Sequence, residues 1–278
     1  QWAAAGMNKT VNSADRSGIL VVSAAGNEGL DLDHSGNWIS VPAQSGAGVA
    51  VLRLGHGGGC NNGGVSVLSG GVISTGGLGH LAINGLGGPS PGPGNQGVIL
   101  KGGAIESSGG DFMLVGQGGG TGTSTSNGGV VIDNDSSILA AGSGSIRIEG
   151  IAGNVSTGSP GVNLFSGLVT TAGGDVQVIG FAGTNVGESV TITGSIQPAA
   201  GGSVMIEGDR LQINSDASID VGNRTVTLLP PTINRGIDLG GVDSSAKLGL
   251  GDSELDRIIA GTLQIGDAES GPITVTGL

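Results

Sequence analysis

The stretch GVILKGGAIESSGGDFMLVG at Gly97–Gly116 decides the fold, because it holds three short apolar alternations separated by glycine-rich corners. The same phrase recurs as GVSVLSGGVISTGGLGHLAING (Gly64–Gly85), GVVIDNDSSILAAGSGSIRIEG (Gly129–Gly150), GVNLFSGLVTTAGGDVQVIG (Gly161–Gly180) and ESVTITGSIQPAAGGSVMIEG (Glu188–Gly208). Self-similarity at a fixed period of about 20–50 residues is typical of solenoids and arrays. The chain is therefore interpreted first as a repeat protein.

Three sets of markers agree on one period, which falls within the range typical of solenoids. The first segment of each repeat starts at Val65, Val98, Val130, Val162 and Val190, and the last of these steps is the shortest. The middle segment is marked by Ile73, Ile105, Ile138, Leu168 and Ile196, and the third ends at Gly85, Gly116, Gly150, Gly180 and Gly208. A still shorter repeat follows at Leu211/Ile213, Ile219 and Val226/Leu228.

The longer period therefore indicates insertions at one corner of an elementary repeat of about 22 residues. Two of these insertions are Leu86–Gln96 and Gln117–Asn127. Insertions in repeat proteins map to loops on one face, which is often the binding face. We expect any partner, a surface protein or glycan of a host or neighbouring cell, to bind at these loops.

Inside each repeat the apolar residues alternate with a period of two, as in half-buried strands. In the third segment the inward pairs are Leu81/Ile83, Phe112/Leu114, Ile146/Ile148, Val176/Val178 and Val204/Ile206, with polar Arg147 and Gln177 between them. Such short strands cannot close a core within one repeat, but parallel stacking buries their inward side chains. Glycine supplies the positive φ angles that the corners need. The pattern predicts an all-β parallel β-helix over residues 65–229.

Composition limits the classes of partner. The chain has 61 glycines and no tyrosine, and its net charge is −12. An acidic surface argues against nucleic acid and anionic lipid as partners. No apolar run approaches the roughly 20 residues that span a membrane. Because the chain begins at Gln1 rather than Met, we expect it to be an internal piece of a longer protein.

Residues 1–52 have a different pattern and are interpreted as a small α/β fragment. Met7–Ser17 is predicted to be a helix and Ile19–Ala24 a buried strand. The phrase GILVVSAAGNEG, followed by DLDHSGNWISVPA, resembles a fragment of subtilisin-like serine peptidases. That resemblance implies that Asn27 matches the side-chain donor of the oxyanion hole. A GTSMA-like segment with the nucleophilic serine is absent from the sequence, so no complete triad is present and we expect no catalysis.

Residues 53–64 are interpreted as a glycine-rich junction, natural or produced by misassembly. His56 and Cys60 fall short of the three or four ligands that zinc needs. The GGD phrases at Asp111 and Asp175 resemble calcium-binding nonapeptides, but serine replaces the aspartate in alternate repeats. We expect no metal and no cofactor.

The acidic residues Asp133, Asp135, Glu149 and Glu207 leave open a carbohydrate-active β-helix enzyme as an alternative. The sequence has few aromatic side chains that could stack on sugars. A piece of a subtilisin-like serine endopeptidase fused to the repeats is the other alternative, and it ranks ahead of the carbohydrate-active enzyme.

Residues 230–278 are expected to extend the stack. Strands are predicted at Lys247–Leu250, Thr262–Ile265 and Ile273–Val275. A short helix is predicted from Ser253 to Gly261, with a capping box at its start.

The run LGLGDSELDRIIAGTLQIGDAESGPITV, together with the GGDVQVIG-type phrases, resembles filamentous-haemagglutinin-type exoproteins of Gram-negative bacteria over residues 65–278. The resemblance implies a right-handed parallel β-helix, export across the outer membrane and a role in adhesion. The leading interpretation is a structural and adhesive segment of a secreted or surface-exposed bacterial exoprotein, extracellular or at the cell surface.

Overall fold

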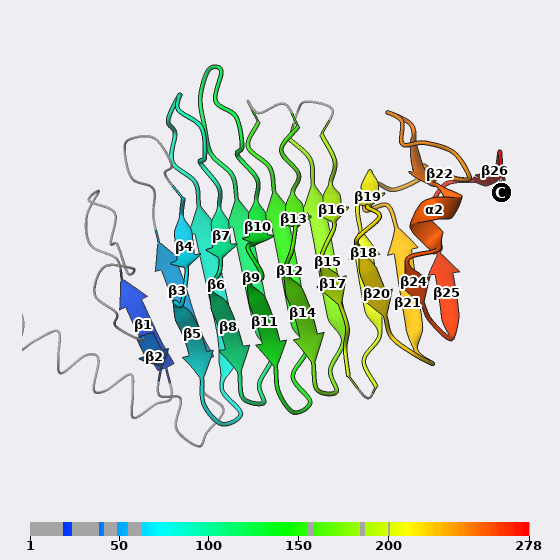
Figure 1. Ribbon diagram of the computed structural model, residues 1–278. Coiled ribbons are helices and arrows are strands. Elements are labelled where there is room, and N and C mark those ends of the chain that lie inside the picture. The colour runs from blue at the N-terminus through cyan, green and yellow to red at the C-terminus, as the bar shows by residue number, and fades with distance from the viewer. Residues whose placement is uncertain are drawn as a thin grey trace, which may run out of the picture.

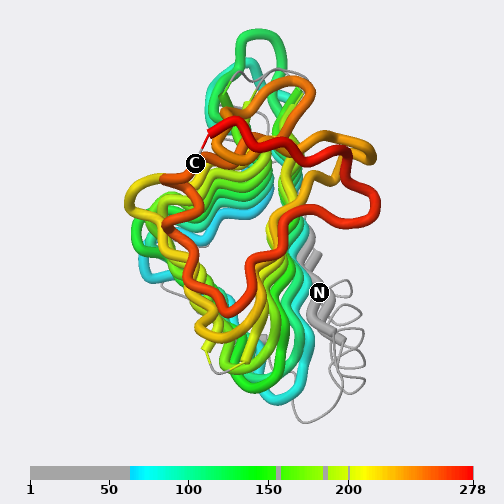
Figure 2. The backbone as a smooth tube through the Cα atoms, turned by 90° about the vertical axis from the view of Figure 1, so that its right-hand side faces the viewer, coloured from blue at the N-terminus to red at the C-terminus, as the bar shows by residue number. Residues whose placement is uncertain are grey.

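The computed structural model describes residues 63–154, 158–183, 187–199 and 201–277, together with the backbone of three strands at 19–23, 39–41 and 49–54. The described chain is almost entirely β, and every strand pair is parallel (Figure 1). The strands fall into three long sheets and one short sheet. Seen along the stack, successive repeats lie one behind the other (Figure 2).

Each repeat contributes one strand to each long sheet. The six-stranded sheet contains β4 (Val65–Leu68), β7 (Val98–Lys101), β10 (Val130–Asp133), β13 (Val162–Leu164), β16 (Val190–Ile192) and β19 (Leu211–Ile213). The eight-stranded sheet contains β2 (Ile39–Val41), β5 (Val72–Thr75), β8 (Ala104–Ser107), β11 (Ser137–Ala140), β14 (Leu168–Thr171), β17 (Ser195–Ile196), β20 (Ser218–Asp220) and β24 (Ile258–Ile259).

The nine-stranded sheet holds the third strand of each repeat. Its members are β1 (Ile19–Ser23), β3 (Val49–Leu54), β6 (His80–Leu86), β9 (Phe112–Gln117), β12 (Ile146–Ile151), β15 (Val176–Phe181), β18 (Val204–Glu207), β21 (Thr225–Leu229) and β25 (Thr262–Ile265). Equivalent strands of successive repeats, although separated in the sequence by a whole repeat, are therefore nearest neighbours in space.

The strand register confirms the predicted repeat. The column of first-strand valines runs in register from Val65 to Val190 and continues to Leu211. The inward pairs of the third strands are also in register, from Leu81/Ile83 to Val226/Leu228. These side chains are buried and form one continuous core. Aliphatic columns along the stack therefore supply the apolar burial that no single repeat could provide.

One predicted marker is wrong by a single residue. In the middle column Ile138 pairs with Val169, whereas Leu168 pairs with Ser137. Val169 is fully buried, and the Leu168 side chain is 37% exposed. Since side chains alternate across a strand, this shift moves Leu168 to the outer face. The core marker of the fourth repeat is therefore Val169.

The distal segment differs from its prediction in two respects. Helix α2 covers only Asp252–Leu255, and Ile258–Ile259 forms β24, paired with β20. The predicted strands are present, but β23 (Lys247–Leu250) and β26 (Ile273–Val275) do not extend the long sheets. They flank β22 (Gly236–Leu239) in a separate three-stranded sheet.

The long sheets start upstream of residue 65, the first residue of the repeats predicted from the sequence. β3 pairs with β6, β1 pairs with β3, and β2 pairs with β5. β1 confirms a strand within the predicted Ile19–Ala24 stretch, and β3 overlaps the first two residues of the predicted 53–64 junction. Asn27, the predicted helix Met7–Ser17, and the pair His56 and Cys60 lie outside the described residues.

Candidate functional site

The connections between the nine-stranded and six-stranded sheets form a ridge along one corner of the stack (Figure 1). These connections are 87–97, 118–129, 152–161 and 182–189, of which 155–157 and 184–186 lie outside the described residues. The next connection, 208–210, is much shorter than any of them. The predicted insertions Leu86–Gln96 and Gln117–Asn127 belong to this ridge. Because the 208–210 connection is so short, the ridge ends before the sixth repeat begins at β19.

Buried asparagines order the first two connections of the ridge. Asn95 and Asn127 are both fully buried. The Oδ1 atom of Asn127 accepts hydrogen bonds from the Asn95 backbone N–H at 3.1 Å, from Asn95 Nδ2 at 3.1 Å and from Ser124 Oγ at 3.0 Å. The Asn127 N–H in turn donates to Ser159 Oγ at 2.9 Å. The ridge is thus a stacked, hydrogen-bonded structure rather than a row of independent loops.

The outer edge of the ridge presents small and rigid side chains. Its exposed residues include Pro89, Pro91, Pro93, Thr121, Thr123 and Thr125. The Thr121 N–H donates to the Ser90 carbonyl oxygen, and the Gly94 N–H donates to that of Thr125. These backbone bonds hold neighbouring tips together, and the proline rings and threonine hydroxyls face solvent.

The aspartates of the GGD phrases serve as links between repeats. Asp111 Oδ1 accepts from the Ser145 N–H at 3.0 Å, and Ser145 Oγ accepts from the Asp175 N–H at 3.2 Å. Asp175 Oδ1 then accepts from the Ser203 N–H at 2.8 Å. Aspartate and serine alternate because either side chain supplies the acceptor. The carboxylates consequently stand two repeats apart.

The acidic residues considered for glycoside chemistry do not gather in one place. Asp133 ends β10 and Asp135 lies in the turn that follows, whereas Glu149 and Glu207 lie on the outer face of the nine-stranded sheet. There Arg147 donates to Glu149 at 2.9 Å, and Gln177 donates to Glu207 at 2.7 Å. These groups form a surface network across the strands.

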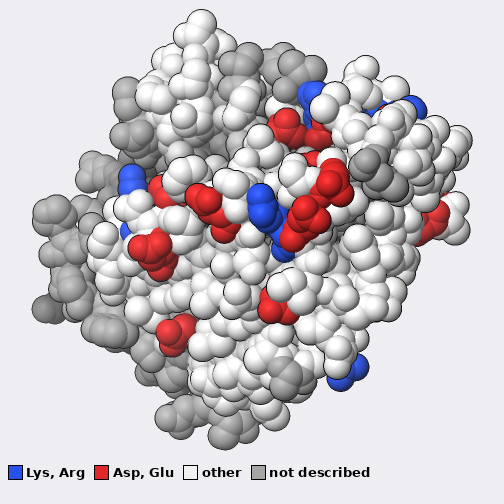
Figure 3. Space-filling view, turned by 45° about the vertical axis from the view of Figure 1, so that its right-hand side comes forward, with Lys and Arg blue, Asp and Glu red and all other residues white. Residues whose placement is uncertain are grey.

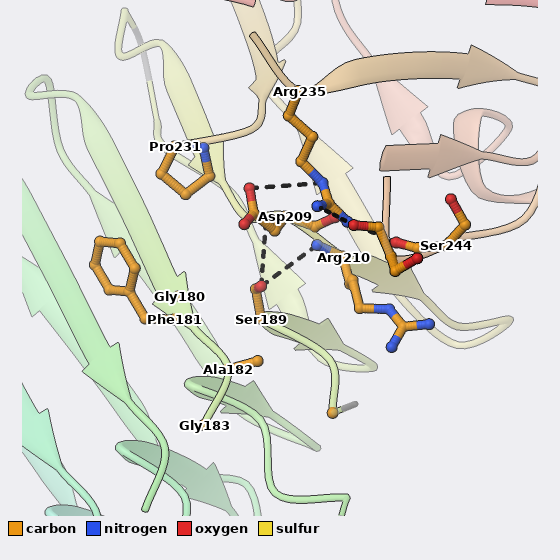
Figure 4. Close-up of a pocket in the computed structure, with 12 residues that line it drawn as sticks. Gly180, Phe181, Ala182, Gly183, Ser189, Asp209, Arg210, Pro231, Arg235 and Ser244 are labelled. Atoms are coloured by element: carbon orange, nitrogen blue, oxygen red, sulfur yellow. Dashed lines mark hydrogen bonds and ion pairs between the residues drawn. The ribbon is translucent and has the colours of Figure 1, made fainter. Parts of the chain in front are cut away.

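A pocket of about 270 Å³ opens where the ridge ends. One wall comes from the end of β15 and from Ala182, Gly183, Gly187 and Ser189, and the other from Asp209 and Arg210 in the short connection. The distal segment closes the pocket with Pro231, Arg235 and residues 244–245 (Figure 4). The hollow exists because the 208–210 connection is too short to continue the ridge.

Hydrogen bonds fix the carboxylate of Asp209. The Thr232 N–H donates to Oδ1 at 3.2 Å, and the Thr232 hydroxyl donates to Oδ2 at 2.5 Å. Arg235 Nε lies 3.6 Å from Oδ1, and its side chain is only 10% exposed. Arg235 also donates to the backbone carbonyl oxygens of Asp209, Ser244, Ser245 and Lys247. Arg235 thus holds the distal segment against the stack and orients Asp209.

The opposite side of the pocket is apolar. Figure 4 shows the rings of Phe181 and Pro231 on one side, with Asp209 and Arg235 across from them. The Phe181 side chain is 38% exposed. Between the two sides, Ser189 Oγ accepts from the N–H groups of Asp209 at 3.1 Å and Arg210 at 3.3 Å. Ser189 itself is buried, at 1% exposure, so its hydroxyl orders the backbone of Asp209 and Arg210.

Carboxylates also line the boundary between the distal segment and the six-stranded sheet. Glu254 Oε1 accepts from the Ile213 N–H of the edge strand β19 at 3.0 Å. Asp243 accepts from the Gly249 N–H at 2.8 Å. Burial raises the pKa of Asp243 to about 7, the Gly249 N–H opposes the rise, and the nearby carboxylates Glu188 and Glu254 add to it.

The raised pKa of Asp243 predicts that the fold loses stability as the pH rises from acid to neutral. The folded protein favours the protonated carboxyl, so its stabilising effect is complete below pH 3.8, the ordinary pKa, and is lost as the pH rises through about 7. Because Asp243 is partly exposed, we expect a loss of only about 2 kcal/mol in the free energy of unfolding between about pH 5 and pH 8.

Urea unfolding followed by circular dichroism at several pH values measures this loss. Asp243→Asn keeps the acceptor for Gly249 and should remove most of the decrease. Asp216→Asn, at an exposed turn, is the matched control and should behave like the wild type. An Asp243→Asn protein that loses as much stability as the wild type would contradict the assignment.

Charged side chains are scattered over a mostly uncharged surface (Figure 3). Within the described part of the chain, no three His, Cys, Asp or Glu side chains are grouped to hold a metal ion. Among the same residues, no helix has the length and hydropathy to cross a bilayer. A scan against protein-family models and searches of curated proteins and of solved structures find no match to this chain.

Proposed function

We propose that this chain is a structural and adhesive segment of a secreted or surface-exposed bacterial exoprotein. In this proposal the three long sheets close into a right-handed parallel β-helix. Binding occurs at the ridge, and the chain itself is not catalytic. The partner is a surface protein or glycan of a host or neighbouring cell, which places the protein outside a Gram-negative bacterium or on its surface.

The ordered ridge is the observation that carries the proposal. The aliphatic columns build a continuous stack, and the insertions that lengthen the elementary repeat are placed at the same corner. Buried asparagines hold the first two connections in register, so the tips of these two connections form one continuous surface. A preorganised surface loses little conformational entropy on binding, which favours affinity.

Cell binding by the fluorescently labelled chain tests the proposal. The variant Thr123→Arg/Thr125→Arg places two bulky charges at the ridge, at side chains that are exposed. We expect it to lower the cell-bound signal, measured by flow cytometry on epithelial and Gram-negative cells, at least fivefold. The control Ser143→Arg/Ala172→Arg adds the same charge at exposed positions after β11 and β14.

Three results would count against the proposal. The wild type could fail to bind any cell type, or the control could lose as much binding as the ridge variant. Casein hydrolysis that is abolished by Asn27→Ala would instead favour the peptidase alternative.

A further inference from the structure

We propose that the pocket at the end of the ridge binds a neutral hexose, such as the terminal sugar of a surface glycan. This inference deepens the proposed adhesive function and rests on it for the source of the sugar. A pyranose has an apolar face of C–H groups and a rim of hydroxyl groups. The pocket offers a matching pair of surfaces, an exposed ring on one side and oriented polar groups on the other.

Phe181 provides the surface for the apolar face of the sugar. It ends β15 and remains 38% exposed, although aromatic side chains make up only 2% of the sequence. An aromatic ring supplies a large, rigid apolar area. Pro231 lies on the same side of the pocket. Together the two rings leave an apolar surface exposed beside polar groups, as in a site for an amphipathic ligand.

Asp209 provides a partner for the hydroxyl groups of a sugar. Asp209 is held by Thr232 and Arg235, and its side chain is still 30% exposed. A carboxylate accepts up to about four hydrogen bonds, so it can accept from a sugar hydroxyl in addition. Ser189 is buried, and its Oγ accepts the N–H groups of Asp209 and Arg210, which fixes the backbone that carries the carboxylate. The site thus offers a fixed and accessible acceptor opposite the apolar rings.

The charges around the pocket favour a neutral ligand. Arg235 is engaged by Asp209 and by backbone carbonyl oxygens. Arg210 is close enough to Asp243 for its positive charge to lower the pKa of that carboxyl. Glu188 is also close enough to raise that pKa. The positive charges are therefore offset locally, and the chain carries a net charge of −12 that repels anions.

The volume sets the size of the ligand. About 270 Å³ lies just below the roughly 300–1,000 Å³ of pockets that enclose drug-sized ligands. One sugar ring is the appropriate size, and the rest of a glycan chain would extend into solvent.

Saturation-transfer NMR with the intact chain tests the inference. The probes are methyl glycosides of galactose, glucose and mannose, with methyl glucuronide as the charged comparison and cyclohexanol as the apolar one. We expect at least one neutral glycoside to bind, and to bind at least tenfold more tightly than either comparison. The same sugar attached to albumin mimics the terminus of a glycan, and the free glycoside represents a small soluble sugar. Comparing the two separates these sources of the ligand, and we expect both forms to bind.

Matched variants locate the site. Phe181→Ala and Asp209→Asn should each weaken hexoside binding at least tenfold, and Phe181→Trp should restore it. Phe165→Ala removes another exposed phenylalanine, 54% exposed and outside the pocket, and should leave binding unchanged. Three results would overturn the inference. The Phe165 variant could lose as much hexoside binding as the Phe181 variant, the glucuronide or cyclohexanol could bind more tightly than every hexoside, or no hexoside could bind.

The two proposals can fail separately. If hexosides do not bind but the ridge variant still lowers cell binding at least fivefold, the adhesive function stands and the hexose site is wrong. If hexosides bind and Phe181→Ala abolishes their binding while the wild type binds no cells, the pocket stands and adhesion is wrong.

Discussion

Gly150→Ala is expected to lower the free energy of unfolding by about 4 kcal/mol, or to prevent folding altogether. Gly150 lies in a column of glycines on the nine-stranded sheet, in register with Gly116 and Gly180. A β-carbon at Gly150 would overlap the carbonyl oxygen and carbon of Gly161 in the next connection. Because these obstructing atoms belong to the backbone, a rotamer change cannot relieve the overlap.

Urea unfolding followed by far-UV circular dichroism measures the effect. Gly251→Ala is the matched control, since the nearest atom to its added β-carbon is Glu254 Oε2, at an ordinary 3.4 Å. We expect it to cost less than about 1 kcal/mol. If Gly150→Ala were as stable as this control, the close packing of each third strand against the following connection would be wrong.

Asn127→Ala is expected to cost about 3 kcal/mol, because it removes the acceptor of three buried hydrogen bonds. The Asn95 N–H would then be left without its partner in a site closed to water. Hydrogen exchange measured by mass spectrometry should show faster exchange confined to the ridge, together with a lower urea midpoint.

Two comparisons make the asparagine prediction specific. Asn127→Ser introduces the residue that occupies this position one repeat later, as Ser159, and should lose about half as much stability. Asn223→Ala, at an exposed turn, should change the free energy of unfolding by less than about 0.5 kcal/mol. Equal effects of Asn127→Ala and Asn223→Ala would rule out a structural role for the buried asparagines.

The repeat could be predicted from the sequence because every inward column is aliphatic and every corner is rich in glycine. The single register error has a local cause. Leu168 and Val169 are adjacent aliphatic residues, so alternation alone cannot decide which one points inward. Pairing with Ser137 and Ile138 decides it, and those neighbours belong to the preceding repeat.

The distal helix was predicted too long for a similar reason. Leu255, Ile258 and Ile259 have helical spacing, but the Ile219 N–H donates to the Arg257 carbonyl oxygen at 3.0 Å. The Val221 N–H likewise donates to that of Ile259 at 2.9 Å. These bonds to β20 favour a strand over a further helical turn, and a tertiary contact of this kind leaves no local signal in the sequence.

The two parts of the candidate site were not equally visible in the sequence. The ridge was predicted from the insertions. The asparagines that order it could also be found in the sequence, because Asn62, Asn95 and Asn127 each stand at the same position before the first valine of a repeat. The pocket had none. Phe181, Asp209 and Arg235 come from separate segments that meet only because one connection is short.

The contact between Glu254 and the edge of the six-stranded sheet has a consequence for self-association. An exposed edge strand offers unpaired N–H and C=O groups to strands of other molecules. On β19 the Ile213 N–H is already taken by Glu254, whose other carboxylate oxygen accepts from the Gly251 N–H at 2.9 Å. A strand from a second molecule would have to displace a charged side chain held at both oxygens. This edge is thereby protected against aggregation at high protein concentration.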